Sequence, residues 1–78
     1  MISATKVVLA TRVEASREFL LIVTDSGEYR VPWAECSPIL ANATEEERAR
    51  LAVSPSGYGI HWPLLDEDLT VKGLVGRG

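Results

Sequence analysis

The most informative segment of this 78-residue sequence is GYGIHWPLLDEDLTVKG, residues 57–73. Two glycines flank Tyr58 and predict a loop, because glycine adopts backbone angles that other residues avoid. Ile60–Trp62 predicts a short strand, and Pro63 ends it because proline has no backbone N–H. We expect Asp66 to cap a final helical turn that starts at the acidic triplet. That turn is expected to carry three apolar side chains inward: Leu69, Val71 and Leu74.

The N-terminal part of the chain predicts an antiparallel meander of three strands. Residues 6–15 alternate in polarity, which is typical of a half-buried strand. The side chains expected on its inner side are Val7, Leu9, Thr11 and Val13. The run from Phe19 to Thr24 is apolar on both sides, which indicates a central strand covered on both faces. Asp25-Ser26-Gly27 predicts a turn, and Glu28–Val31 predicts a third strand that Pro32 ends.

The middle of the chain predicts short helices. Pro38 excludes a long helix across residues 33–40, although one helical turn can precede it. Thr44 and Glu47 match a capping box, in which each residue accepts the backbone N–H of the other. A helix from about residue 45 to residue 52 is therefore expected.

Length and composition favour one small domain. A chain of 78 residues has room for a single core, and 46% hydrophobic with 24% charged residues is typical of globular proteins. We expect one domain, residues 1–78, of the α+β class: a three- to four-stranded antiparallel sheet (an N-terminal meander) with one or two short helices. Its ordered core is expected at about residues 5–75, with a frayed tail at residues 76–78.

Cysteine usage and the first residues favour the cytoplasm. Cys36 is the single cysteine, so the disulfides usual in small secreted domains are excluded, and we interpret it as a small buried residue. Residues 1–6 lack the basic start and apolar core of an export signal. No segment approaches the roughly 18 apolar residues of a membrane span. We expect a cytoplasmic protein with no membrane partner.

Charge argues against direct nucleic-acid binding, because the net charge is −3 and phosphate contacts need clustered Lys and Arg. Six acidic residues form two triplets, Glu45-Glu46-Glu47 and Asp66-Glu67-Asp68. The plainer interpretation of these triplets is helix-terminus chemistry and solubility. Their functional interpretation is a negative face that docks onto a basic partner surface.

Tyr58 is the leading candidate contact residue. It lies between two glycines in a predicted loop, and aromatic side chains in such places often anchor interfaces. Trp33 and Trp62 are instead expected to fill the core, which is the usual place for large aromatics in a small domain. The predicted partner-binding residues are Tyr58, Glu45, Glu46, Glu47, Asp66, Glu67 and Asp68.

We predict no catalytic site, no metal and no cofactor. His61, Asp66 and Asp68 have metal-ligand chemistry, but a good site needs three or four converging ligands. Their plainer interpretation is an edge histidine and acids at a helix start. The serines lack the surroundings of a nucleophile elbow, and Gly57-Tyr58-Gly59 lacks the third glycine of a dinucleotide loop. We therefore expect that the protein is not an enzyme.

Two motifs carry a family resemblance: GIHWPLLDED at residues 59–68, and Val31-Pro32-Trp33 upstream of it. With them, about residues 5–75 resemble a family of small bacterial proteins that is classed only as a domain of unknown function. The resemblance implies a small antiparallel sheet with one or two helices, and it carries over no catalytic residues. Members are often encoded beside a toxin-like protein, so the resemblance also implies an antitoxin-like role.

Two functions follow as hypotheses. The first is a non-catalytic module that binds and neutralises a toxin-like partner protein. The second is a phage-type inhibitor, such as an anti-CRISPR or anti-restriction protein, whose acidic surface blocks the basic nucleic-acid-binding site of a defence protein. Small size and the acidic triplets favour the second. Both predict protein binding without turnover, and the oligomeric state is left open because an exposed edge strand offers a place for self-pairing.

Overall fold

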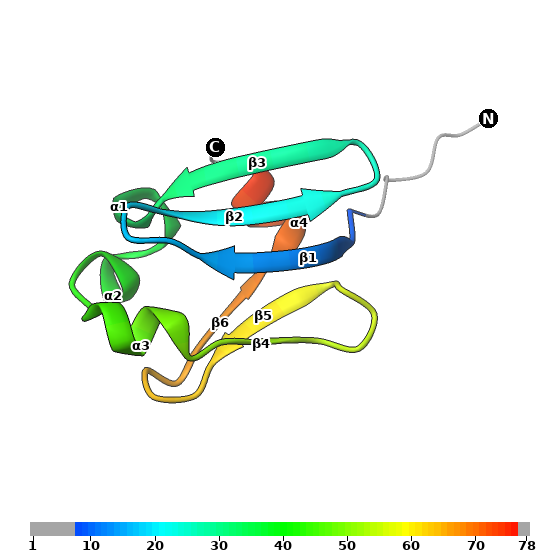
Figure 1. The fold of residues 1–78 in the computed structure, drawn as a ribbon. Coiled ribbons are helices and arrows are strands. Elements are labelled where there is room, and N and C mark those ends of the chain that lie inside the picture. Colours follow the sequence, from blue (N-terminus) through cyan, green and yellow to red (C-terminus); the bar gives the residue numbers. More distant parts are fainter. Residues whose placement is uncertain (1–7, 77–78) are drawn as a thin grey trace.

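The computed structural model describes residues 8–76, which form two three-stranded antiparallel sheets and four short helices (Figure 1). The first sheet contains β1 (Ala10–Ala15), β2 (Phe19–Thr24) and β3 (Gly27–Pro32), in the order β1-β2-β3. The second contains β4 (Ala52–Val53), β5 (Gly59–Trp62) and β6 (Glu67–Thr70), in the order β4-β5-β6. The helices are α1 (Trp33–Cys36), α2 (Pro38–Ala41), α3 (Glu45–Ala49) and α4 (Val71–Val75).

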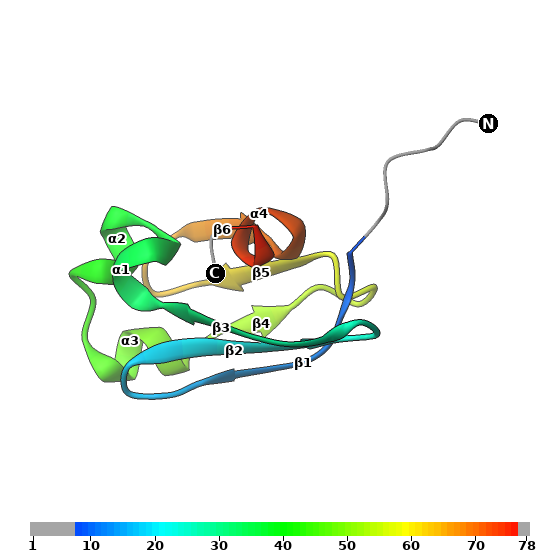
Figure 2. The same ribbon diagram turned by 90° about the horizontal axis from the view of Figure 1, so that it is seen from above.

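The α+β class and the N-terminal meander are confirmed, whereas the arrangement of the sheets differs from the prediction. The strand predicted at residues 60–62 is β5, but it is the centre of a second sheet instead of a fourth strand of the first. Helices α1, α2 and α3 connect the two sheets. Figure 2 shows β5, β6 and α4 on the same side of the first sheet, so a single core is enclosed between them.

Strand β2 has one core face and one partly exposed face. Leu20 and Ile22 are fully buried, whereas Phe19, Leu21 and Val23 are half-buried on the opposite face. The expectation that β2 is covered on both faces is therefore wrong for the outer face. An antiparallel sheet of three strands can leave one face toward solvent, because its connections are tight turns and not crossover helices.

Strand β1 is shorter than predicted and carries a register shift. It begins at Ala10, and its pairing with β2 shifts between Ala10 and Arg12. Thr11 is exposed and Leu9 precedes the strand, so neither has the inner position expected of it, whereas Val13 is half-buried opposite a core residue. An extra residue in one strand reverses which side chains face the core beyond it. Two residues of the predicted strand, Lys6 and Val7, lie outside the described residues.

The connecting helices begin at side-chain caps. The single turn α1 ends before Pro38, as predicted. Pro38 then starts α2, where Ser37 caps the helix and a proline in the first turn costs no hydrogen bond. The predicted capping box is present, since Thr44 Oγ1 accepts the Glu47 N–H at 3.1 Å and Glu47 Oε1 accepts the Thr44 N–H at 2.9 Å.

The end of the chain contradicts the predicted helical turn at the second acidic triplet. Glu67–Thr70 is a strand that pairs with β5, and Asp66 lies in the preceding turn with φ of 52°. Aspartate is among the few residues that tolerate this left-handed conformation. The last helix starts at Val71 and is capped by Thr70, not by Asp66. The local sequence favoured a helix start, but the backbone N–H and carbonyl groups of this segment form their hydrogen bonds with β5 instead of within a helix.

Helix α3 is also shorter than predicted. It ends at Ala49, and Ala52–Val53 already pairs with β5 as β4. Of the predicted frayed tail, only Gly76 is described, and its N–H donates to the Lys72 carbonyl at 3.2 Å. None of the helices in the described part of the chain has the length and apolar character of a membrane span.

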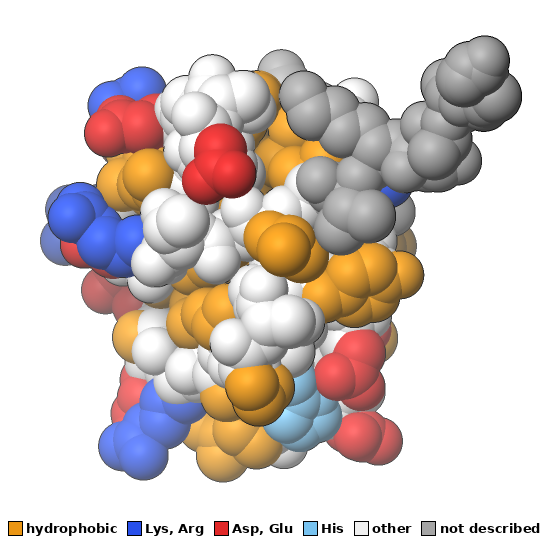
Figure 3. All heavy atoms as spheres, turned by 90° about the vertical axis from the view of Figure 1, so that its right-hand side faces the viewer, with side chains coloured by type: hydrophobic (Ala, Val, Ile, Leu, Met, Phe, Trp, Pro, Cys, Tyr) orange, Lys and Arg blue, Asp and Glu red, His pale blue; other side chains and the backbone are white. Residues whose placement is uncertain are grey.

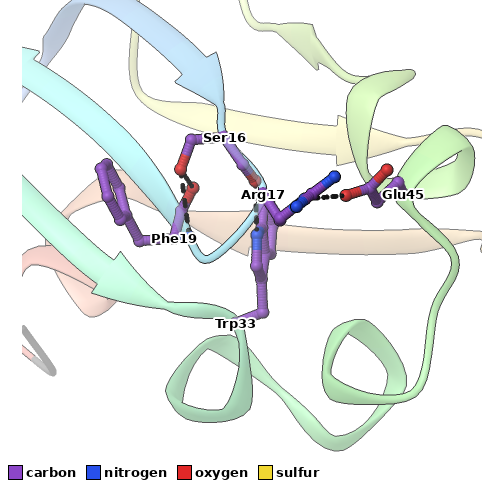
Figure 4. Close-up of polar contacts among 5 residues, drawn as sticks. All are labelled: Ser16, Arg17, Phe19, Trp33 and Glu45. Atoms are coloured by element: carbon purple, nitrogen blue, oxygen red, sulfur yellow. Dashed lines mark hydrogen bonds and ion pairs between the residues drawn. The ribbon is translucent and has the colours of Figure 1, made fainter.

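Two tryptophans join the parts of the core. Trp33 and Trp62 are both buried and meet edge to face, with ring centroids 6.5 Å apart. The Trp33 indole N–H donates to the Ser16 carbonyl at 2.9 Å, which ties α1 to the β1–β2 turn (Figure 4). The Trp62 indole N–H donates to the Arg48 carbonyl at 3.0 Å, which ties β5 to α3. Cys36, interpreted as a small buried residue, is also in this core.

Gly57 brings the loop before β5 against β1. Its φ is 79°, and its carbonyl accepts the Ala10 N–H at 2.8 Å. A Cβ at this position would overlap the Ala10 carbonyl oxygen. Glycine is therefore required twice at this position, for its backbone angle and for the close approach of the two segments.

We predict that Gly57→Ala lowers the free energy of unfolding by about 2 kcal/mol or more. The backbone strain of a positive φ and the overlap of the new Cβ with the Ala10 carbonyl oxygen both contribute to this loss. Gly27→Ala, which has positive φ but open space around it, should cost less, and Gly76→Ala, with helical φ, should cost least. Urea denaturation followed by tryptophan fluorescence measures all three. Similar values for Gly57→Ala and Gly76→Ala would contradict this prediction.

Candidate functional site

An open, mainly apolar hollow of about 490 Å³ lies over the second sheet and the loop before β5. Its apolar lining includes Val53, Pro55, Tyr58 and Leu69, and we call it the Tyr58 hollow. Figure 3 shows apolar side chains beside the single histidine on this side of the molecule, with acidic side chains next to them. The volume is within the range of about 300–1,000 Å³ that is usual for binding pockets.

The loop that carries Tyr58 is held by hydrogen bonds on both sides. Ser54 Oγ accepts the N–H groups of Tyr58 and Gly59 at 2.9 and 3.0 Å. The Gly57 N–H donates to the Ser54 carbonyl at 2.8 Å, and the Tyr58 carbonyl accepts the Val71 N–H at 2.9 Å. The backbone of Tyr58 is thus fixed, although the residue as a whole is 55% exposed. An exposed aromatic on a fixed backbone loses little conformational entropy when it is buried by a partner.

His61 and Asp68 form a cross-strand pair that lines the hollow. The two residues are opposite each other on β5 and β6, and His61 Nδ1 lies 2.8 Å from Asp68 Oδ1. Strand alternation explains the position of His61, because its neighbours Ile60 and Trp62 are buried in the core. The pair engages Nδ1 of the imidazole ring, and the His61 side chain is still 43% exposed, so a bound partner can contact it.

The remaining acids of this triplet extend the negative charge away from the hollow. Asp66 lies in the β5–β6 turn, and Glu67 is the first residue of β6. Within residues 8–76, neither carboxylate forms an ion pair with a basic side chain. Of the three acids, Asp68 alone lines the Tyr58 hollow, whereas Asp66 and Glu67 lie beyond it along the chain, in the turn and at the start of β6.

The three residues considered as metal ligands do not converge. Asp68 is opposite His61, whereas Asp66 lies in the turn at a positive φ. In the part of the chain that the structure describes, no group of three or more His, Cys, Asp or Glu side chains is placed to hold a metal ion.

The other acidic triplet makes contacts within the molecule. Glu47 closes the capping box of α3. Glu45 Oε2 lies 3.0 Å from Arg17 Nε (Figure 4), and Glu46 Oε2 lies 3.3 Å from Arg50 Nη2. The structure therefore brings Tyr58 together with Asp68, while it places the three glutamates on a separate element where each already has an intramolecular partner.

The sequence did not predict most of the apolar residues that line the Tyr58 hollow. Val53 follows a predicted helix and Leu69 was assigned to another, so neither was expected beside Tyr58. Both residues line the hollow only because β4 and β6 flank β5, with Val53 and Leu69 each paired with Ile60 from opposite sides. The one local signal was the glycine- and serine-rich loop, which correctly predicted an exposed Tyr58.

Comparisons with other proteins agree with this fold. Residues 10–78 match the model of the family described as "Protein of unknown function (DUF2442)". The structure is similar to a crystal structure of a protein of unknown function from Rhodospirillum rubrum, with a TM-score of 0.77 and 24% sequence identity over 91% of this chain and 90% of that chain. At this identity the likeness concerns the fold alone. A search among curated proteins found no match.

The role of the glutamate triplet as a helix start can be tested through its cap. Thr44→Ala should lower the free energy of unfolding by about 1 kcal/mol, because the Glu47 N–H loses its acceptor. Glu46→Ala removes only an exposed ion pair and should change stability by less than about 0.5 kcal/mol. Urea denaturation compares the two variants, and equal losses would contradict the assignment of the cap to Thr44.

Proposed function

This chain belongs to the DUF2442 family, and we propose that it is a non-catalytic module that binds and neutralises a partner protein in the manner of an antitoxin. The proposed contact surface is the Tyr58 hollow together with the acidic residues 66–68, of which Asp68 lines the hollow. One observation carries the proposal: an exposed tyrosine stands on a hydrogen-bonded loop beside an open apolar hollow. Exposed aromatics that are fixed beforehand are typical anchors of protein interfaces.

The surface fits a partner segment that is both apolar and basic. Val53 and Tyr58, both exposed, supply apolar area for a large side chain of the partner. The carboxylates of Asp66 and Glu67, which have no ion-pair partner within residues 8–76, attract a Lys or Arg that follows it. Apolar burial then supplies most of the affinity, while the charges raise the rate of association.

The carboxylates of Asp66 and Glu67, which have no ion-pair partner in the described part of the chain, also favour a second candidate function. In this alternative the protein is a phage-type inhibitor, such as an anti-CRISPR or anti-restriction protein. Its acidic residues then occupy the basic nucleic-acid-binding site of a defence protein. Charge then supplies most of the affinity, so binding weakens steeply as salt increases. Glu45 and Glu46 contribute less in either case, because Arg17 and Arg50 already neutralise them.

The tyrosine anchor is tested with a matched pair of variants. Tyr58 and Leu64 are both 55% exposed, but Leu64 lies outside the hollow. Tyr58→Ala should weaken binding at least tenfold, about 1.4 kcal/mol, whereas Leu64→Ala should leave it unchanged. The partner is isolated by affinity capture from the source cells and purified, and titration calorimetry then measures both variants. Equal affinities for the two variants would contradict the proposed surface.

The two candidate functions differ in how they respond to loss of charge. Asp66→Asn with Glu67→Gln keeps the turn and the strand but removes two negative charges. For the antitoxin-like module this double variant should lower the association rate several-fold with a small loss of affinity. For the inhibitor of a nucleic-acid site it should abolish binding at physiological salt. Glu46→Gln is the control in both cases, and turnover of a substrate by the purified protein would contradict both.

A further inference from the structure

The outer face of the first sheet carries an apolar stripe that the proposed binding site does not use. Phe19, Leu21 and Val23 lie half-buried along β2 on the face away from the core. In the part of the chain that the structure describes, no helix or strand lies over this face (Figures 1 and 2). The stripe is bounded by the two neighbouring strands, β1 and β3.

Four charged residues frame the stripe, two on β1 and two on β3: Arg12, Glu14, Glu28 and Arg30. All four are exposed. Within each strand the two charges pair with each other, at 2.9 Å between Arg12 Nε and Glu14 Oε2 and at 3.5 Å between Arg30 Nη2 and Glu28 Oε1. Such exposed pairs contribute little to stability, so they can exchange partners at small cost.

The register of the strands arranges these charges in a checkerboard. Residues paired across neighbouring strands present their side chains on the same face. In the row through Val23, the β1 residue is basic (Arg12) and the β3 residue is acidic (Glu28). In the row through Leu21 the order is reversed, with the acid on β1 and the base on β3.

We propose that this face binds the same face of a second copy of the chain in a two-fold symmetric dimer. A two-fold axis along β2 places β1 of one copy over β3 of the other, so every basic residue meets an acidic one. An axis across the strands exchanges the two rows and gives the same result. Both arrangements also place one apolar stripe on the other, and neither brings like charges together. A two-fold interface requires a surface that is complementary to itself, and this charge pattern meets that requirement.

The size of the face determines how strong the dimer is. Three strands spaced about 4.8 Å apart form a small contact, below about 1,200 Å² in total, where association is weak. Arg30 also covers part of the Phe19 ring, with its guanidinium carbon 5.8 Å from the ring centre, and it has to move when the faces meet. We therefore expect a dimer that forms at protein concentrations of about 0.1–1 mM and dissociates as salt screens the charge pairs.

A charge exchange tests the dimer. Arg12→Glu with Arg30→Glu makes the frame wholly acidic, and Glu14→Lys with Glu28→Lys makes it wholly basic. Each double variant should be monomeric by sedimentation equilibrium at low salt, because like charges then face each other. An equimolar mixture of the two should form a heterodimer. A mixture that stays monomeric would overturn the proposal.

A matched control separates the face from net charge. Arg17→Glu with Arg50→Glu gives the same net charge as the acidic-frame variant, but it changes residues near α3. This control should dimerise as the unmodified chain does, and its dissociation would overturn the proposal. Dilution of the unmodified chain, followed by NMR, needs no variant. Amide shifts that change with concentration should centre on β2, and a chain that is monomeric at about 1 mM and low salt, or shifts centred on the Tyr58 hollow, would also overturn it.

Discussion

The contact between Trp33 and Trp62 is the interaction on which the rest of the structure depends. Each sheet has only three short strands, so neither can bury a core of its own. The two indole rings meet edge to face between the sheets, and their N–H groups bond to the β1–β2 turn and to the end of α3. One buried pair therefore joins the first sheet, the helical connection and the second sheet. The Arg48 guanidinium, 5.2 Å from the centre of the Trp33 ring, adds a cation–π contact at the same place.

The residues that pack into this core determine which of their neighbours along each strand face the solvent. Because Ile60 and Trp62 are buried, His61 between them faces outward and meets Asp68. The same alternation on β2 buries Leu20 and Ile22 and turns Leu21 toward the checkerboard of charges. The His61–Asp68 pair and the checkerboard of charges thus lie on the outer faces of the two sheets, whose inner faces make the core. This relation explains how a small domain can carry two separate candidate interfaces, one on each sheet.

Features that depend on a few neighbouring residues were predictable from the sequence. The capping box of Thr44 and Glu47, the hairpin turn ending at Gly27 and the strand Phe19–Thr24 all occur as expected. Each results from local geometry or from an apolar run long enough to define a strand. The exposure of Tyr58 was also predictable, since its flanking glycines indicate a loop. The apolar lining of its hollow was not, because it comes from three strands separated along the chain.

The sequence by itself determined the α+β class, the first meander, the capping box of α3 and the exposed Tyr58, because their signals lie within a few residues of one another. Only the tertiary structure decided that Glu67–Thr70 is a strand, because an acidic triplet before an apolar residue satisfies the rules for a helix start equally well. Pairing with β5 settled that choice. The shift at Thr11 and the checkerboard of charges are likewise properties of register. Register is set by hydrogen bonds between strands, and no short stretch of one strand contains that information.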